Sequence, residues 1–199
     1  MTAVRAFVAL PLPAGAIEVC VRTQEELQSR GVRGRVRWTR PEQMHVTVKF
    51  LGGLAASDVD RACDVVRRAA LGSCPFSCAM GSPDAFPTPR RARVVVAQLA
   101  SVPTLEALFA ELQGGFAPLA VHEEKRAFTP HVTLGRLRQP ANIEAQLSGF
   151  ESAAGAVRLD TLVLFRSELA PDGSRYTPLV RAPLGGSQPA TAREPASEP

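Results

Sequence analysis

Residues 45–48 read His-Val-Thr-Val, and residues 131–134 read His-Val-Thr-Leu. The chain has only three histidines, so two of them lie in copies of one short motif, 86 residues apart. Each copy has the pattern of a strand, and a helix pattern precedes each copy in the chain. This repeat indicates an internal duplication. We therefore expect two similar lobes, related by a pseudo-twofold axis, that bring both motifs to one cleft.

The alternation of side chains along a strand decides what each motif presents. In the first copy, His45, Thr47 and Lys49 are expected on one face, and Phe50 on the opposite, inward face. One such strand by itself is most often an ordinary half-exposed strand, whereas two copies at matching places favour a shared site. Phe50 and Trp38 could stack on a nucleic-acid base, but aromatic side chains at inward strand positions more often belong to the core.

Two opposed imidazoles can perform acid–base chemistry, because histidine titrates near neutral pH. One ring would accept a proton from a nucleophile while the other donates a proton to the leaving group. The hydroxyls of Thr47 and Thr133 would donate hydrogen bonds to an anionic centre between them. A phosphodiester fits this arrangement, since attack and departure take place on opposite sides of phosphorus. We expect no metal ion and no cofactor, because neither motif has a third ligand at zinc spacing.

The flanks of both motifs carry a family resemblance. Residues 41–52 read Pro-Glu-Gln-Met-His-Val-Thr-Val-Lys-Phe-Leu-Gly, and residues 128–136 read Phe-Thr-Pro-His-Val-Thr-Leu-Gly-Arg. They resemble the two-histidine phosphoesterase superfamily and, within it, the bacterial RNA 2′,3′-cyclic phosphodiesterases, also called 2′-5′ RNA ligase-like proteins. Further matching segments are residues 5–10, 37–38, 85–90 and 165–176. The resemblance implies an α+β fold with two curved antiparallel sheets flanking a central cleft, and helices outside.

The resemblance also implies a role for each motif residue. His45 matches the proton donor to the departing ribose 3′ oxygen, and His131 matches the base that accepts a proton from water. Thr47 and Thr133 match the hydroxyls that hold the phosphate. Each motif would thus supply one imidazole and one hydroxyl to the implied active site.

Three arginines are candidates for contacts with phosphate. Arg136 matches a phosphate-contacting arginine of the family, with an exposed arginine at a strand end as the alternative. Strand alternation does not place Arg136 beside His131, so we expect a bend or bulge at Gly135. Arg90 and Arg91 lie in a loop with two prolines, where contact with RNA and simple solubility explain them equally well.

The implied function is metal-independent hydrolysis of RNA 2′,3′-cyclic phosphate ends to 2′-phosphomonoesters. Its substrates would be RNA ends or nucleoside 2′,3′-cyclic phosphates. Two alternatives stay open: ATP-independent 2′-5′ ligation as the reverse reaction, and a non-catalytic module that binds RNA ends. The phosphate-binding pattern G-x-x-x-x-G-K-[ST] does not occur in the sequence, which argues against an ATP-dependent ligase. Turnover of a nucleoside 2′,3′-cyclic phosphate separates the enzymes from the binding module.

Length and composition agree with one globular unit. The 199 residues are 45% hydrophobic and 21% charged, and the net charge of +4 is carried almost entirely by arginine. Arginine suits phosphate oxygens, although codon usage in the genome explains the bias as well. No apolar run approaches the roughly 18 residues of a membrane span, and the N-terminus fits a strand better than a secretory leader. We expect a cytoplasmic monomer without membrane contact.

Composition and the spacing of hydrophobic residues predict the domain limits, the helices and the strands. We expect one domain over residues 1–184 and a disordered tail over 185–199, because the tail has nothing to bury. His122 is expected to be solvated, and the cysteines to be buried thiols rather than a zinc site at Cys74 and Cys78. Helices are expected over 14–30, 57–71 with Ser57 as N-cap, 103–112 and 143–147. Strands are expected over 4–10, 36–39, 44–51, 76–80, 93–99, 131–137, 157–165 and 176–182.

Overall fold

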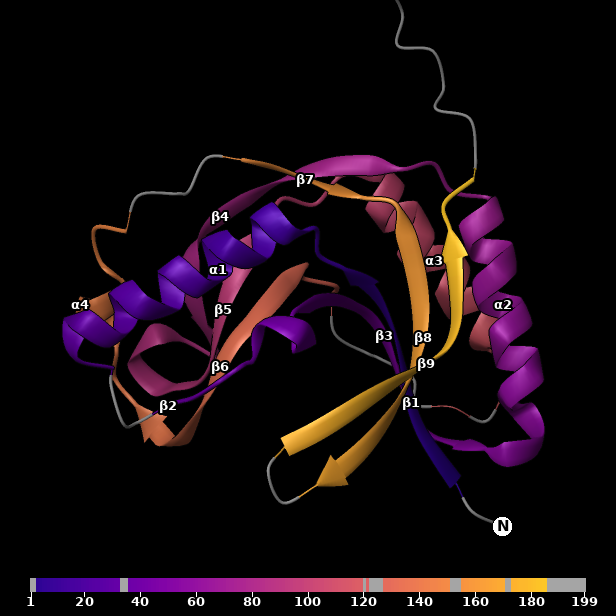
Figure 1. Ribbon diagram of the computed structural model, residues 1–199, viewed down its shortest axis with the longest axis horizontal. Coiled ribbons are helices and arrows are strands. Elements are labelled where there is room, and N and C mark those ends of the chain that lie inside the picture. The colour runs from indigo at the N-terminus through magenta and orange to yellow at the C-terminus, as the bar shows by residue number, and fades with distance from the viewer. Residues whose placement is uncertain are drawn as a thin grey trace, which may run out of the picture.

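The computed structural model describes residues 3–32, 36–119, 121, 127–150, 155–170 and 173–185. Within these residues, nine strands form one curled antiparallel sheet with helices on its outside (Figure 1). The strands are β1 (Ala3–Pro11), β2 (Val36–Trp38), β3 (His45–Ala55), β4 (Phe76–Phe86), β5 (Ala92–Leu99), β6 (His131–Ala141), β7 (Ala156–Leu159), β8 (Thr161–Ala170) and β9 (Gly173–Pro183). The helices are α1 (Ala14–Leu27), α2 (Val59–Leu71), α3 (Pro103–Phe116) and α4 (Glu144–Leu147).

The order of the strands shows the expected duplication. The sheet runs β7-β4-β5-β6-β3-β1-β8-β9, with β2 paired to the far end of β6. One half is therefore β3-β1-β8-β9 and the other is β6-β5-β4-β7, and each half has a histidine strand at its inner edge. The halves meet where Val46 of β3 pairs with Val132 of β6. The bilobal α+β architecture is confirmed, and its two curved halves are continuous through this pair.

Helices α1 and α3 connect the two halves of the sheet. Each helix follows a strand of one half in the chain but packs against the other half. Helix α1 follows β1, yet the Gln24 Nε2 of α1 donates a hydrogen bond to the Leu134 carbonyl of β6, at 2.8 Å. Helix α3 follows β5, yet its Gln113 Oε1 accepts a hydrogen bond from the Lys49 Nζ of β3. Figure 1 shows α2 and α3 beside β8 and β9, with α1 and α4 on the other side of the molecule.

The middle residue of each motif anchors the core. Val46 and Val132 are both 0% exposed, as the inward positions of the strand alternation predict. Burying a valine side chain stabilises the fold by about 1.5–3 kcal/mol. The same two residues form the backbone pair that joins the halves, so burial and pairing fix the motifs at one place.

A bulge follows the second motif in β6. Thr133 pairs with Val96 of β5, but Gly135 pairs with the adjacent Val95, so Leu134 is an extra residue in β6. An extra residue reverses the alternation of side chains beyond it. The bulge expected next to Gly135 is therefore present, and residue 136 comes to the same face as Thr133.

A matching bulge follows the first motif in β3, and it corrects one expectation. Between Thr47 and Lys49, β3 has one residue more than the β1 segment that pairs with it. Lys49 therefore turns inward and is 4% exposed, while Phe50 turns outward and is 52% exposed. The prediction that Lys49 shares the face of His45 and that Phe50 packs inward was wrong, because simple alternation does not continue through a bulge.

Buried glutamine and lysine contacts support the two bulges. The Leu134 carbonyl in the β6 bulge accepts hydrogen bonds from the Gln24 Nε2 and, at 2.9 Å, from the Thr39 backbone N–H. Lys49, next to the β3 bulge, bonds Gln113. A bulge disrupts the regular ladder, so these partners satisfy polar groups that would be costly to bury alone.

Two further expectations about the elements need correction. The strand expected over residues 157–165 is two strands, β7 and β8, which are separated at Asp160 and pair with different neighbours. Ser57 is not the side-chain cap of α2, because a 3-10 turn over Ala56–Asp58 leads into that helix and no side-chain cap bond is formed there. Gly31, with φ of 96°, follows α1 as the expected stop.

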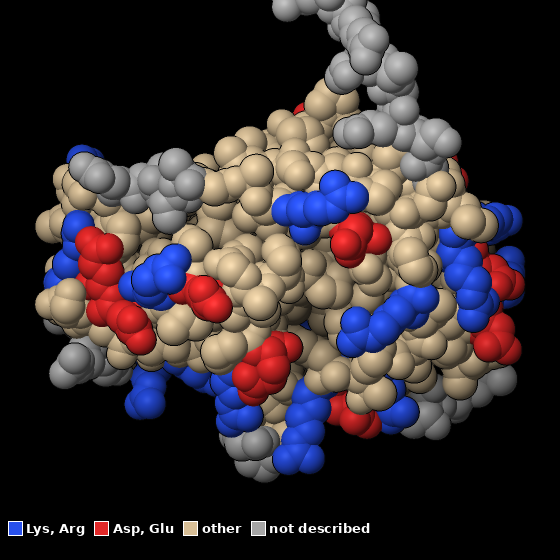
Figure 2. Space-filling model, turned by 45° about the horizontal axis from the view of Figure 1, so that its top comes forward, with Lys and Arg blue, Asp and Glu red and all other residues tan. Residues whose placement is uncertain are grey.

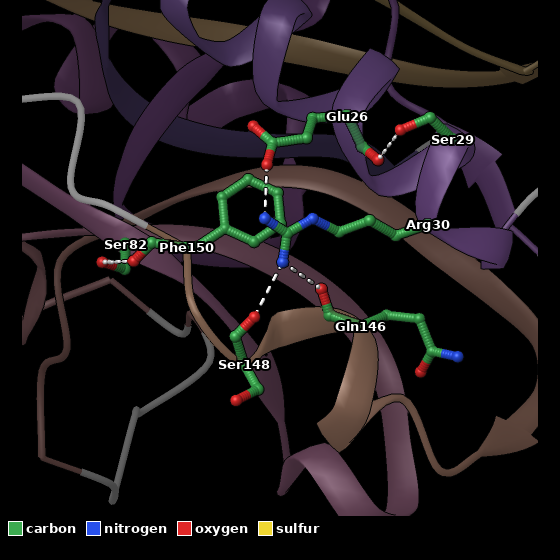
Figure 3. Close-up of polar contacts among 7 residues, drawn as sticks. All are labelled: Glu26, Ser29, Arg30, Ser82, Gln146, Ser148 and Phe150. Carbon is green, nitrogen blue, oxygen red and sulfur yellow. Dashed lines mark hydrogen bonds and ion pairs between the residues drawn. The ribbon is translucent and has the colours of Figure 1, made fainter.

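Arg30, in the π-helical turn Gln28–Val32 that follows α1, connects this end of the helix to the segment around α4. Its guanidinium donates to the Ser148 carbonyl at 2.7 Å and pairs with Glu26, and its carbon Cζ lies 4.0 Å from the centre of the Phe150 ring (Figure 3). The Phe150 carbonyl in turn accepts a hydrogen bond from the Ser82 hydroxyl of β4. This group holds α1 in place over the β4-β5-β6 half of the sheet.

The remaining sequence predictions have mixed outcomes. Cys20, Cys63 and Cys78 are buried free thiols as expected, and Cys74 is half-buried; burial raises the pKa of Cys20 to about 12. Within the described ranges, no helix is both long and apolar enough to span a membrane. His122 and residues 186–199 lie outside the described residues, so the domain limit at residue 184 and the disordered tail stay predictions.

Replacing Gly135 by alanine should destabilise the protein. A Cβ at Gly135 would clash with the Val36 side chain and lie 3.0 Å from Trp38 Cε3, so β2 would have to move away from β6. We expect Gly135→Ala to lower the free energy of unfolding by about 1–3 kcal/mol in urea denaturation. The matched control is Gly114→Ala in α3, where a Cβ meets nothing within 4 Å; it should raise the free energy of unfolding by about 0.5–1 kcal/mol. Equal stability of both variants would contradict this account of β2.

Candidate active site

Because Val46 pairs with Val132, the four polar residues of the two motifs lie around one backbone pair. In an antiparallel pair centred on these valines, His45 lies across from Thr133 and Thr47 lies across from His131. All four side chains point away from the buried valines, and all four line one cavity of about 640 Å³. The structure therefore brings together the two imidazoles and two hydroxyls that the sequence predicted.

The His131 ring is held in a defined orientation. Its Nδ1 lies 2.8 Å from the carbonyl oxygen of Thr129, two residues earlier, and the Phe86 ring meets it edge-on with the centroids 5.0 Å apart. A carbonyl oxygen can only accept, so Nδ1 carries the proton. The neutral ring then keeps a free lone pair on Nε2, which is the form that a general base requires.

The His45 ring has a similar but more enclosed setting. It forms a hydrogen bond with the backbone of Gln43, again two residues earlier, and its Nε2 lies 3.1 Å from the Thr47 Oγ1. The ring stacks on Phe7 with the centroids 5.0 Å apart, and Tyr176 meets it edge-on at 5.5 Å. These aromatic contacts fix the plane of the imidazole and limit its access to water.

Burial lowers the pKa of both histidines below the ordinary value of 6.5. For His45, loss of hydration lowers the pKa to about 4; the bond to the Gln43 backbone opposes this shift, and the nearby charge of His131 adds to it. For His131, burial lowers the pKa, the bond to Thr129 opposes the shift, and Arg136 lowers the pKa further. In the ligand-free protein at pH 7, both rings are therefore neutral.

The charge around the cavity is of one sign. Arg5, Arg37 and Arg136 line it, and its lining within the described residues includes no aspartate or glutamate. By contrast, basic and acidic side chains are interspersed over the face of the molecule that Figure 2 shows. The cavity is consequently suited to an anion. Arg136 lies with the motif residues as expected, because the β6 bulge turns it to their face.

Comparison with known proteins identifies the family. Residues 21–170 match the family described as the 2′-5′ RNA ligase superfamily. The chain belongs to this superfamily.

Curated members of the superfamily match over most of the chain. The RNA 2′,3′-cyclic phosphodiesterase of Methanothermobacter thermautotrophicus is 34% identical over 178 residues, which cover 87% of this chain and 95% of the relative. A protein of the same name from Thermus thermophilus is 30% identical over 204 positions, which cover 98% of this chain and 96% of the relative.

Solved structures share the fold. TT0787 of Thermus thermophilus has a TM-score of 0.80 at 24% identity, over 92% of this chain and 100% of that one. E. coli LigT complexed with 3′-AMP has a TM-score of 0.73 at 23% identity, over 92% of this chain and 99% of that one. At these identities the likeness establishes the curled, duplicated sheet.

Several residues of this superfamily member come to the cavity without having been predicted there. Phe7, Tyr176 and Gln43 surround His45, and Phe86 supports His131. These residues lie in the segments that carry the family resemblance, which was the only signal for them in the sequence. No periodicity indicates that these rings pack against a histidine, because they come from β1, β4 and β9 and from the turn before β3.

Other candidates lie elsewhere or have a different orientation. Arg90 is exposed and pairs with Glu144 at 3.0 Å, and neither Arg90 nor Arg91 is among the residues that line the cavity. Phe50 and Trp38 both line it, so they face the site rather than the core alone. Among the described residues, no three His, Cys, Asp or Glu side chains are grouped as a metal ion requires; metal independence stays a prediction.

Titration of the histidine rings should reveal their burial. By NMR, His45 should titrate near pH 4 and His131 below pH 6.5, because burial disfavours the charged form. The unfolded chain then binds more protons than the native one between these values, so the free energy of unfolding should fall as the pH falls from 6.5 toward 4. Inorganic phosphate should raise both pKa values by attracting the imidazolium. Ordinary pKa values for both rings would contradict the enclosed site.

Proposed function

We propose that this protein hydrolyses the 2′,3′-cyclic phosphate ends of RNA to 2′-phosphomonoesters, without a metal ion in the chemistry. The observation that carries this proposal is the pair of His-x-Thr motifs held face to face across one cavity by the Val46–Val132 pair. The names of the curated relatives, which cover most of this chain, support the same activity.

The acid and the base act on opposite sides of phosphorus. His131 Nε2 takes a proton from water while the water oxygen attacks phosphorus opposite the ribose 3′ oxygen. The bond between phosphorus and the 3′ oxygen breaks, and His45 donates a proton to that oxygen as it departs. The phosphate stays on the 2′ oxygen and the 3′ hydroxyl is restored. The free Nε2 of His131 supports its role as base; the assignment of the acid to His45 follows the family resemblance.

The phosphate oxygens require donors whose bonds strengthen as charge develops on them. Thr47 and Thr133 lie beside the two histidines and would donate hydroxyl hydrogen bonds, and Arg136 would add a charged donor. Because the bulge in β6 fixes Arg136 on this face before substrate arrives, the donors are preorganised. The exposed Phe50 ring offers a surface for the base of the terminal nucleotide.

Substrate binding would also prepare the acid. Ligand-free His45 is neutral at pH 7, since its pKa is about 4. An anionic phosphate in the cavity favours the imidazolium and raises this pKa. The enclosed ring would therefore become protonated mainly when the substrate is present. At that moment its protonated Nε2 would be a strong donor to the departing oxygen.

The same arrangement would also act as a 2′-5′ ligase without ATP. The 5′ hydroxyl of a second strand would take the place of water: His131 would accept its proton as the 5′ oxygen attacks phosphorus, His45 would protonate the departing 3′ oxygen, and a 2′-5′ phosphodiester would remain. The description of the matching superfamily favours this second activity. Water competes with the incoming hydroxyl, so we propose hydrolysis as the net direction.

The direct test is incubation of the purified protein with an oligoribonucleotide that ends in a 2′,3′-cyclic phosphate, in the presence of EDTA. We expect conversion to a 2′-phosphate end, detected by end-group analysis. Binding without conversion would favour the RNA-end-binding module instead. Loss of activity in EDTA with recovery on addition of a divalent ion would contradict the metal-free mechanism, and a 3′-phosphate product would require the two histidines to exchange roles.

Single substitutions separate the two histidines. His45→Ala and His131→Ala should each lower kcat by roughly 10²–10⁴, the usual contribution of a positioned acid or base. A substrate with a good leaving group in place of the 3′ oxygen should partly restore the turnover rate of His45→Ala, because such a group departs without an acid. The same substrate should not restore the turnover rate of His131→Ala. The control is His122→Ala, which should keep the wild-type rate. Near-normal turnover by either motif variant, or selective rescue of His131→Ala, would show the assigned roles to be wrong.

A further inference from the structure

The cavity has two arginines directly opposite each other. In the pairing of β2 with β6, Arg37 is the partner of Arg136, and both line the cavity. Like charges at directly opposed positions of an antiparallel pair destabilise it. The lining provides no carboxylate among the described residues to offset them. Two cationic side chains from paired positions in one cavity favour a ligand that carries more than one negative charge.

The Arg37 side chain extends from one half of the sheet to the other. It projects from β2, and its guanidinium lies against Gly173 at the start of β9, where a Cβ would collide with it. The Gln43 Nε2 donates a hydrogen bond to the carbonyl of the next residue in β9, Ser174. The Arg37 side chain therefore crosses from one half of the sheet to the β8-β9 hairpin of the other, and it lines the cavity.

Arg5 adds a third positive charge, from β1 in the half of the sheet that the Arg37 guanidinium reaches. It lies two residues before Phe7 on β1, and Phe7 is the ring on which His45 stacks. Side chains two residues apart share a face of the strand, so Arg5 lies about 7 Å farther along β1 than Phe7. Arg5 is exposed and lines the cavity. Its charge is thus displaced along β1 from the ring on which His45 stacks.

A cyclic phosphodiester carries one negative charge, which Arg136 and the two threonine hydroxyls can bind. Arg37 and Arg5 supply two further positive charges that this single negative charge does not require. We propose that Arg37 and Arg5 form a second phosphate subsite, which binds the phosphodiester of the nucleotide preceding the reactive end. The preferred substrate is then the end of an RNA strand rather than a free nucleoside 2′,3′-cyclic phosphate. This inference rests on the proposed function for the identity of the reactive end.

Kinetics on two substrates test the subsite. The wild-type protein should have a higher kcat/KM for a tetraribonucleotide with a 2′,3′-cyclic end than for the matching nucleoside 2′,3′-cyclic phosphate. Arg37→Ala should reduce that preference about tenfold, the effect of losing one charged hydrogen bond. Arg37→Lys, which keeps the charge, should retain part of the preference. The control is Arg67→Ala on α2, which removes an exposed arginine paired with Asp64 and should leave the ratio unchanged.

Binding of the product at several salt concentrations provides a readout that does not depend on turnover. The probe is a labelled tetraribonucleotide with a 2′-phosphate end, compared with a nucleoside 2′-phosphate. For a single strand, each phosphate contact adds about 0.7 to the slope of log affinity against log salt. Arg37→Ala and Arg5→Ala should each lower the slope for the tetranucleotide by about that amount, and Arg67→Ala should leave it as in the wild type.

The outcomes distinguish this inference from the proposed function. If Arg37→Ala lowers kcat/KM equally for both substrates and leaves the salt slope unchanged, the second subsite is wrong while the hydrolase proposal stands. If the wild-type protein converts neither substrate, the hydrolase proposal is wrong, and the salt slopes alone decide whether Arg37 and Arg5 bind the strand. A wild-type preference for the free nucleoside phosphate would overturn the inference.

Discussion

The backbone pair between Val46 and Val132 is the constraint on which the site depends. It joins the two halves of the sheet at the centre of both motifs, and it is completely buried. Because strand side chains alternate, burying each valine forces the flanking histidine and threonine to the opposite face. The antiparallel direction then sets each histidine across from the threonine of the other motif. Core packing and active-site geometry are consequently fixed by the same contact.

The bulges after the two motifs give the duplicated halves different chemistry. Each bulge reverses the alternation of side chains and so turns the fifth residue after the histidine toward the cavity. In β3 this residue is Phe50, and in β6 it is Arg136. The symmetric backbone therefore presents an aromatic surface on one wall and a cation on the other. The crossover helices support both bulges, since Gln24 and Gln113 bond groups beside them.

The cavity concentrates features that are unfavourable in the ligand-free protein. Burial lowers the pKa of both histidines, and three arginines line the cavity with no acidic residue among the described lining residues. An anion reverses each of these effects, because it favours the imidazolium and screens the guanidiniums. Such preorganised positive charge is the usual way in which a site stabilises negative charge without moving. The rest of the molecule is stabilised by the buried faces of the sheet and helices and by local contacts such as that of Arg30 with Phe150.

The sequence by itself determined the duplication, the identity of both catalytic candidates and the inward position of Val46 and Val132, because these depend only on a repeated motif and on strand alternation. It also indicated a bulge beside Gly135, since Arg136 could not otherwise join the motif face. Only the tertiary structure decided the orientations of Lys49 and Phe50, because the corresponding bulge in β3 has no marker in the local pattern. The enclosure of His45 by Phe7 and Tyr176, and the opposition of Arg37 to Arg136, likewise required the fold. These contacts join strands that are distant in the chain, and pairing between distant strands is not encoded in any local periodicity.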